Sequence, residues 1–494
     1  MFPGLTLAYW LTLHGLVTIL AVLFYVITSQ LLQQRRHPSA AIAWVLFILL
    51  MPYLALPAFL TFGSRKQVRP RATTPVIGAA TLASERSWPE RTAVALGQPE
   101  AAPYETLHLH ADGGAALASL WQVINGAMHS IEVCTFILGD DALGTQVVER
   151  LASKARAGVR VRLLLDGMGR WMGGRPDLKL LAAAGVELTL FVPPMHSPLK
   201  GRTNLRNHRK LVIADAAYES RRLWCGGRNL ACEYFEGSAD MQAWHDLSFD
   251  LRGALVLQAA SLFEHDWAFA NGLKAVPAMH AASGPSGSAA PSAPSTSSAS
   301  SAPSTPPTPS TPPAPSTRRA QLVASGPDQV DDTVHALLIT AAYRAGHRLQ
   351  LVSPYFVPDS ALLTALCLAA RRGVEVDLLL PRRSNHRMSD LARRRALRSL
   401  NDAGGRVWLT PHMQHAKLAV IDDAVAYTGT ANLDSRSLFL NYELMFAFED
   451  GAAVAACAAW FEHERSLAAR HLPLRPGLWG DLADGLVLGL GFQL

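Results

Sequence analysis

Two stretches, NHRKLVIAD at 207–215 and QHAKLAVID at 414–422, carry a histidine, a lysine two residues later and an aspartate five residues after that. The spacing singles out six candidate catalytic side chains: His208, Lys210 and Asp215 in the first copy, and His415, Lys417 and Asp422 in the second. Alternation along a strand sends residues two apart to one face, so the histidine and lysine of each copy point together. The two aspartates are expected at the strand ends.

The two copies belong to a longer internal repeat. ARAGVRVRLLLD around Gly158 returns as ARRGVEVDLLLP around Gly373. Each half reads as an apolar strand, a helix ending at a glycine, and a second apolar strand. This pattern predicts an α/β sandwich with a parallel or mixed sheet, duplicated along the chain. Two such halves imply a pseudo-twofold arrangement that brings the motifs face to face.

Two imidazoles and two ammonium groups at one site call for an anion between them, and a phosphodiester fits that need. One histidine can attack phosphorus to form a phosphohistidine, while the other acts as general acid and base. The lysines can neutralise the non-bridging oxygens. Four further polar residues are candidates for support: Asn229 and Asn432 as donors to those oxygens, and Asp246 and Glu443 as acceptors that hold an imidazole. Taking each acid with its own half, we expect Asp246 to hold the first histidine and Glu443 to hold the second.

The first 62 residues contain two apolar runs, at 5–27 and 40–62, each about as long as a bilayer core requires. A basic turn at 33–39 separates them, and Pro38 is placed to begin the second helix. Four basic residues follow the second run against two arginines in the turn, so the positive-inside rule puts the main body on the cytoplasmic side. A hairpin that enters the membrane only partly is the alternative.

Residues 280–318 consist almost wholly of Ala, Ser, Pro, Thr and Gly and cannot form a core, so they are expected to be a disordered linker. The predicted organisation is a transmembrane hairpin at 1–64, a connector at 65–104, a first α/β half at 105–279, the linker at 280–318, a second half at 319–470 and a tail at 471–494 that could rest on the membrane interface.

Composition limits the partners. The net charge of +6 favours anionic partners such as lipid headgroups, and is far below that of a dedicated nucleic-acid binder. The five cysteines form no CxxC pair and no finger spacing, which predicts buried thiols without disulfides or structural zinc. We expect no catalytic metal and no cofactor. The arginine-rich segment 381–405 could contact anionic headgroups or be an ordinary solvated helix face.

These residues resemble the phospholipase D superfamily, whose signature is a pair of HxKxxxxD motifs on a duplicated α/β fold. Within it the chain is similar to bacterial cardiolipin synthases through RRHPSAAIAW, SPYFVPDSALLTAL and GTANLDSRSLFLNYEL. The resemblance implies a multi-pass enzyme of the bacterial inner membrane that transfers a phosphatidyl group between two phosphatidylglycerol molecules, giving cardiolipin and glycerol. It also implies that His208 is the nucleophile and His415 the acid and base.

Other functions remain compatible with the same motifs. A phospholipase D would let water resolve the intermediate and release phosphatidic acid. A phosphodiesterase acting on nucleic acid would have no need of the two apolar runs. An inactive membrane scaffold would be expected to lack a motif histidine or lysine, and all four are present. The sequence leaves open the acceptor alcohol and the oligomeric state.

Overall fold

The computed structural model describes residues 7–31, 38–62, 86–193, 204–237, 242–272, 318–329, 331–477, 480 and 484–485. The predicted linker, apart from residue 318, lies outside these residues. So do the first part of the predicted connector, at 65–85, and most of the predicted tail beyond residue 477.

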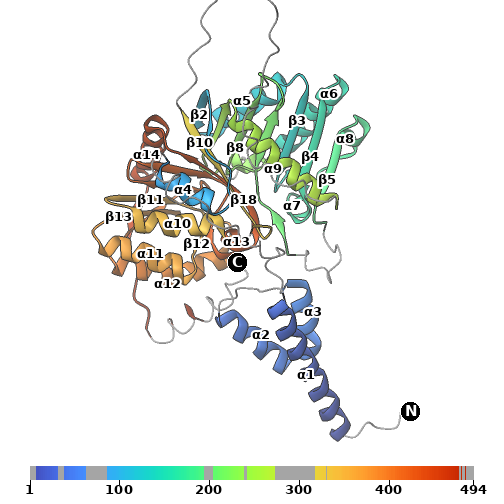
Figure 1. Ribbon diagram of the computed structural model, residues 1–494, viewed down its shortest axis with the longest axis vertical. Coiled ribbons are helices and arrows are strands. Elements are labelled where there is room, and N and C mark those ends of the chain that lie inside the picture. The colour runs from blue at the N-terminus through green and yellow to red at the C-terminus, as the bar shows by residue number, and fades with distance from the viewer. Residues whose placement is uncertain are drawn as a thin grey trace, which may run out of the picture.

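The first half is built on a seven-stranded sheet (Figure 1). Its strands, in spatial order, are β2 (Thr106–His110), β9 (Ser248–Arg252), β8 (Arg222–Gly226), β7 (Leu211–Ala214), β3 (Ser130–Thr135), β4 (Arg160–Asp166) and β5 (Glu187–Phe191). The pairs β3–β4 and β4–β5 are parallel and the others antiparallel. The sheet is therefore mixed, with one parallel βαβ side and one antiparallel side.

The second half repeats this order strand for strand. Its sheet runs β10 (Arg319–Ser325), β18 (Asn441–Phe448), β16 (Val425–Gly429), β15 (Leu418–Ile421), β11 (Arg348–Val352), β13 (Glu375–Pro381) and β14 (Arg406–Thr410). The pairs β11–β13 and β13–β14 are again the parallel ones. The duplication predicted from sequence is confirmed. At the edges, β1 (Ala102–Pro103) pairs with β10 and β19 (Ala469–His471) with β14.

Helices cover both sheets, and corresponding helices end in the same way. The longer ones are α5 (Gly113–Gly126), α6 (Ala142–Arg156) and α9 (Leu255–Ala270) in the first half, and α10 (Thr333–Arg344), α11 (Ser360–Arg371), α12 (Arg387–Asp402) and α14 (Gly451–Ser466) in the second. Past the ends of α6 and α11, Gly158 and Gly373 have φ angles of 89° and 92°. Glycine adopts this left-handed backbone without strain, so both predicted helix ends are confirmed.

The two sheets share an apolar core, so the halves form one body. Phe249 of the first sheet packs with ring centroids 5.2 Å from Phe446 and 5.5 Å from Phe448 of the second. In addition, β6 (Arg206–Asn207), which precedes the first motif, pairs in parallel with β18 of the other half. Part of the predicted connector also belongs to this body, because α4 (Trp88–Ala95) packs on the second-half core and β1 extends its sheet.

The N-terminal region forms three helices, α1 (Leu7–Leu31), α2 (Pro38–Leu50) and α3 (Pro52–Phe62) (Figure 1). Pro38 begins a helix as predicted. The second apolar run, expected to be one helix, is divided at Met51. Proline disfavours helical backbone in the residue before it, which explains the break. Within the described residues, no helix combines the length and the apolar character that spanning a membrane requires.

Candidate active site

His208 and Lys210 lie where β6 leads into β7. The backbone N–H of His208 donates to the carbonyl of Tyr442, 2.9 Å away, which continues the pairing of β6 with β18. Arg209 between them points the other way, toward Asp266 and the carbonyl of Ser325, so alternation places His208 and Lys210 on one face, as predicted. Lys210 Nζ donates to the carbonyl of His208 over 2.7 Å. The ring of Phe136 lies 5.2 Å from that of His208.

The second motif repeats this arrangement before β15. Lys417 Nζ lies 2.8 Å from Nδ1 and 3.0 Å from Nε2 of His415. The backbone N–H of His415 donates to the carbonyl of His245 over 2.6 Å, which ties the second motif to the first half. The two histidines differ in access, since the side chain of His208 is 12% exposed and that of His415 is 4% exposed.

The carboxylates that hold the histidines are exchanged between the halves. His208 Nδ1 lies 3.0 Å from Glu443, and His415 Nδ1 lies 2.7 Å from Asp246 Oδ2. The expectation that each acid serves the histidine of its own half is therefore wrong. The cause is the pairing of backbones across the halves: β6 runs beside β18, and residue 245 forms a bridge with residue 414. With each Nδ1 held by a carboxylate, Nε2 is the ring nitrogen that can act on a substrate, and in His415 it also lies 3.0 Å from Lys417 Nζ.

Both histidines are held neutral. Burial, opposed by the nearby Glu443, lowers the pKa of His208 to about 4. Burial and the neighbouring Lys417 lower the pKa of His415 to about 3. A neutral imidazole has the free electron pair that a nucleophile requires.

The protonated forms of the two motif lysines, Lys210 and Lys417, are also destabilised. Burial lowers the pKa of Lys210 to about 7, and the charge of Lys417 adds to the effect. Burial lowers the pKa of Lys417 to about 8. Lys210 in turn contributes to the low pKa of His415, so each motif lysine affects the other motif and the two copies share one electrostatic site. A bound anion would relieve this repulsion.

The carboxylates stay ionised despite full burial. Burial alone would raise the pKa of Asp246, but Lys417 and His415 bring it down to about 2. For Glu443 the contact with His208, the charge of Lys210 and a bond from Thr430 Oγ1, 2.6 Å from Oε2, likewise outweigh burial and lower the pKa. Thr430 was not among the candidate site residues that the sequence indicated.

Glycine makes room for Asp246. A Cβ atom on Gly227 would lie 2.3 Å from Asp246 Oδ1, and one on Gly429 would lie 2.1 Å from the carbonyl oxygen of Leu444. These two glycines therefore make room for the carboxylate and for the strand that supports Glu443. Gly227 occupies the place in GGRN that Thr430 occupies in GTAN, so the two halves support their acids differently.

The two asparagines are engaged with protein groups. Asn229 Oδ1 accepts from the backbone N–H of Ile137 over 3.2 Å, and its side chain also bonds to Tyr234. The side chain of Asn432 bonds to Asp434, and its Oδ1 atom is buried without a partner among the described residues. Donation by Asn229 and Asn432 to phosphate oxygens stays a prediction.

Asp215 and Asp422 lie at the strand ends, as predicted, but they do not contact the histidines, so their inclusion among the catalytic residues is corrected. β7 separates Asp215 from Lys210 by a span of about 16 Å. Each aspartate accepts hydrogen bonds from three consecutive backbone N–H groups of the turn before a central strand. The donors, all within 3.0 Å, are Met128, His129 and Ser130 for Asp215, and Gly346, His347 and Arg348 for Asp422. Their φ angles of 52° and 49° place both in the left-handed region, so each anchors a strand end.

One group of side chains has the composition of a metal site, although none was expected. The ligand atoms of His245, His412 and Glu464 lie within 4.8 Å of one another. Glu464 lies 3.1 Å from His245 Nδ1 and 3.2 Å from His412 Nε2. The two rings are stacked 3.5 Å apart, however, and in-plane lone pairs of stacked rings cannot both aim at one ion. As placed, the cluster forms a hydrogen-bonded network in which one carboxylate joins two imidazoles.

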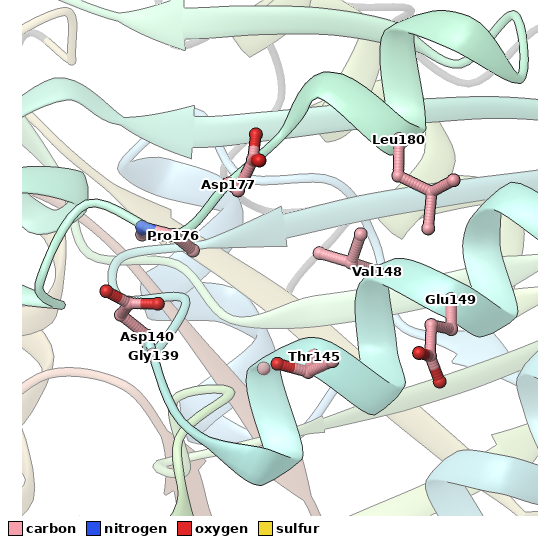
Figure 2. Close-up of a pocket in the computed structure, with 9 residues that line it drawn as sticks. Gly139, Asp140, Thr145, Val148, Glu149, Pro176, Asp177 and Leu180 are labelled. Atoms are coloured by element: carbon pink, nitrogen blue, oxygen red, sulfur yellow. The ribbon is translucent and has the colours of Figure 1, made fainter.

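A cavity of about 230 Å³ lies in the first half, beside α6 and the loop after β3 (Figure 2). Figure 2 shows three carboxylates at its wall, those of Asp140, Glu149 and Asp177. Among the described residues its lining includes no motif residue. Its negative charge does not suit an anionic headgroup, so the site of interest remains the paired motifs.

The comparisons with known proteins agree with this geometry. A family profile described as "Cardiolipin synthase, PLD-like domain" matches residues 120–267 and 338–465, which together make up more than half of the chain. A second profile, "Phospholipase_D-nuclease N-terminal", matches residues 17–64. The first profile matches each half once, as the duplication requires.

Relatives extend the similarity along the whole chain. The chain is 29% identical over 508 residues to "Cardiolipin synthase A" of Shigella boydii and to the protein of that name in Escherichia coli K12, covering 96% of this chain and 98% of each relative. Among solved structures, phosphatidylserine synthase of Haemophilus influenzae matches with a TM-score of 0.55 at 13% identity, covering 83% of this chain and 100% of that one. At this identity the structural match supports the fold alone.

Proposed function

Because the chain belongs to the family of PLD-like cardiolipin synthase domains, we propose that it transfers a phosphatidyl group from one phosphatidylglycerol to another, releasing glycerol and forming cardiolipin. The observation that supports this most strongly is the pair of neutral histidines, each with an ionised carboxylate on Nδ1 and a lysine beside it. Such a site can bind a phosphodiester anion and act on it from two sides.

In the first step, His208 Nε2 attacks phosphorus and the bond from phosphorus to the glycerol oxygen breaks. Glu443 stabilises the positive charge that develops on the ring. His415, which is protonated once the phosphodiester is bound, gives this proton from Nε2 to the departing oxygen, and glycerol leaves. We assign the nucleophile to His208 because it is the more exposed of the two and because the superfamily resemblance favours the N-terminal histidine.

In the second step, the glycerol hydroxyl of another phosphatidylglycerol loses its proton to His415 and attacks phosphorus. The bond between phosphorus and His208 breaks, and both histidines return to their starting states. A bound phosphodiester favours protonation of His415, because its charge offsets that of Lys417, one of the causes of the low pKa. No step draws on a metal ion.

The N-terminal region is proposed to hold the enzyme at its substrate. Its helices carry many exposed apolar side chains, among them Leu16, Ile19, Leu50 and Leu54. We propose that residues 1–64 form a membrane hairpin in the bacterial inner membrane, with the catalytic halves on the cytoplasmic side and anionic lipids as the surroundings. The division into halves at 105–279 and 319–470, joined by the linker, completes the proposal.

The full-length enzyme in vesicles of phosphatidylglycerol, labelled in the terminal glycerol, tests the function. We expect cardiolipin and free labelled glycerol in equal amounts. Phosphatidic acid as the main product would show a hydrolase instead, and cleavage of single-stranded DNA at comparable efficiency would show a nuclease. His208→Ala is the control that separates enzyme turnover from spontaneous hydrolysis.

A further inference from the structure

Two arginines near His208 have no part in the mechanism above. Arg206 lies on β6, two residues before His208, and Arg436 lies on α13 (Ser435–Phe439). Asn207 and Arg209 point into the protein, where both bind Asp266. Strand alternation therefore sends Arg206 to the face on which His208 meets its substrate.

The partner strand confirms this direction. Tyr442 of β18 pairs with Asn207 and packs its ring 4.9 Å from Phe191 in the core. Its neighbours Asn441 and Glu443 therefore point to the opposite, catalytic face. Asn441 is the register partner of Arg206, and its Nδ2 atom donates to Glu443 Oε1 over 3.2 Å. Arg206 thus stands beside the carboxylate that holds His208.

Arg436 approaches the same place from the second half. Its guanidinium donates to Asn204, with contacts of 3.2 Å to Oδ1 and 3.1 Å to the backbone oxygen. Burial and the proximity of Arg206 lower its pKa, and burial also lowers the pKa of Arg206. The two guanidinium groups are therefore close enough to repel each other.

Neither arginine is neutralised by contact. Among the described residues, no carboxylate lies within 4.0 Å of either guanidinium, although ion pairs of many other arginines are present. The acids that act on them electrostatically, Asp166, Asp434 and Glu443, are hydrogen-bonded to other groups, and Glu443 holds His208 and Thr430. Asp166 accepts from the backbone N–H groups of Met168, Gly169 and Asn207, each at 2.9 Å, and Asp434 accepts from that of Ser437.

An unused donor lies in the same group. Asn204 is 5% exposed, and its Nδ2 atom has no hydrogen-bond partner among the described residues. Buried donors normally find an acceptor, and the guanidinium group of arginine can form bidentate bonds with phosphate. The guanidinium groups of Arg206 and Arg436 and the amide of Asn204 therefore form a group of donors with no bound anion. A phosphate oxygen would satisfy all three.

We infer that Arg206 and Arg436 bind the phosphodiester of the acceptor phosphatidylglycerol, an inference that rests on the proposed transfer between two such lipids. Residues two apart on a strand are separated by about 6–7 Å. This is close to the length of the glycerol bridge that joins the two phosphates of cardiolipin. An acceptor phosphate held at Arg206 therefore places the free glycerol hydroxyl of that lipid at the phosphorus on His208.

Binding at this site would favour the hydroxyl of phosphatidylglycerol over water as the acceptor. Both nucleophiles can use His415 as the base, but only the lipid gains charge-assisted hydrogen bonds from the arginines. The enzyme then selects the acceptor by its phosphate charge. The hydroxyl group alone cannot decide, because glycerol and many small alcohols carry the same group.

Competition between two acceptors tests the inference. The full-length enzyme receives one labelled phosphatidylglycerol donor with unlabelled phosphatidylglycerol and a neutral primary alcohol, and the ratio of cardiolipin to phosphatidyl-alcohol is measured. Arg206→Gln and Arg436→Gln should each lower this ratio at least tenfold, about the worth of one charge-assisted bond. Arg206→Lys should restore part of it. Arg371→Gln, the same change at an exposed arginine, should leave the ratio unchanged.

The outcomes separate the possible sources of the phosphate. If the arginines held the donor's phosphate, both products would fall in parallel and the ratio would stay constant, which would overturn the inference. A melting temperature equal to that of the unsubstituted enzyme shows that a fallen ratio does not come from misfolding. Failure of the proposed function would give a different result, because the unsubstituted enzyme would then form no cardiolipin at all.

Discussion

Replacing Asp246 by asparagine, and Glu443 by glutamine in a second variant, tests the exchange of carboxylates between the halves. Each change keeps the side-chain shape and removes one charge. Both acids are fully buried, and Asp246 lies 2.7 Å from His415 while Glu443 lies 3.0 Å from His208. If the structure is right, the two variants slow different steps.

The size of the effect follows from the contact. A hydrogen bond to a charged group contributes about 1.5–3 kcal/mol. Two charges about 4 Å apart at an effective dielectric constant near 20 interact by about 4 kcal/mol. A loss of about 2–4 kcal/mol in the step that charges the imidazole corresponds to a rate lower by about 30-fold to 1,000-fold.

A donor with a nitrophenol leaving group separates the steps, because this group departs without protonation. Asp246→Asn should keep the burst of nitrophenol and accumulate an acid-labile adduct on His208, since only the base for the second step is weakened. Glu443→Gln should slow the burst itself and accumulate none. Rapid quenching and peptide mapping of the adduct provide both measurements.

Peptide mapping also keeps the test independent of which histidine is the nucleophile. If the acids are exchanged, the acid in the same half as the nucleophilic histidine supports the other histidine, which is the base. Removing that acid should therefore let the adduct build up. An adduct on His208 that builds up in Glu443→Gln but not in Asp246→Asn would refute the exchange. Asp402→Asn, at an exposed surface carboxylate, should match the unsubstituted enzyme in both measurements.

Two further predictions concern the lysines and a glycine. With short-chain phosphatidylglycerol, kcat/KM should fall as the pH rises from 7 to 9, because buried Lys210 and Lys417, with pKa values of about 7 and 8, lose the charge that binds the phosphodiester; a flat profile over this range would contradict the assignment. Gly227→Ala should reduce activity at least tenfold, because the new Cβ would lie 2.3 Å from Asp246 Oδ1 and must displace this carboxylate. Gly126→Ala, where a Cβ meets nothing within 4 Å, should keep full activity, and equal activity of the two variants would show that Asp246 needs no such space.

Much of the fold follows from local patterns in the sequence. The duplication, the mixed sheets and the helix ends at Gly158 and Gly373 agree with expectation, because side-chain alternation and glycine backbone preference act over a few residues. The same reasoning placed His208 with Lys210 on one face. Pro52 also carried a local signal, a helix break, which the reading of one continuous apolar run overlooked.

Local patterns in the sequence could not predict which residues the motif residues contact. Asp215 and Asp422 have the spacing of catalytic groups, but their surroundings are backbone N–H groups of turns 74 to 87 residues away. No short-range pattern indicates which turn will meet a strand end. Their role as anchors became visible only with the sheet order.

The sequence by itself determined that two histidines, each with a lysine, would act together on an anion. Only the tertiary structure decided which acid serves which histidine and that Arg206 and Arg436 converge beside them. His208 and Glu443 are 235 residues apart in the chain, and their contact depends on the register of β6 against β18. Strand register across two halves is fixed by the packing of their shared core, and residue spacing within either half carries no information about it.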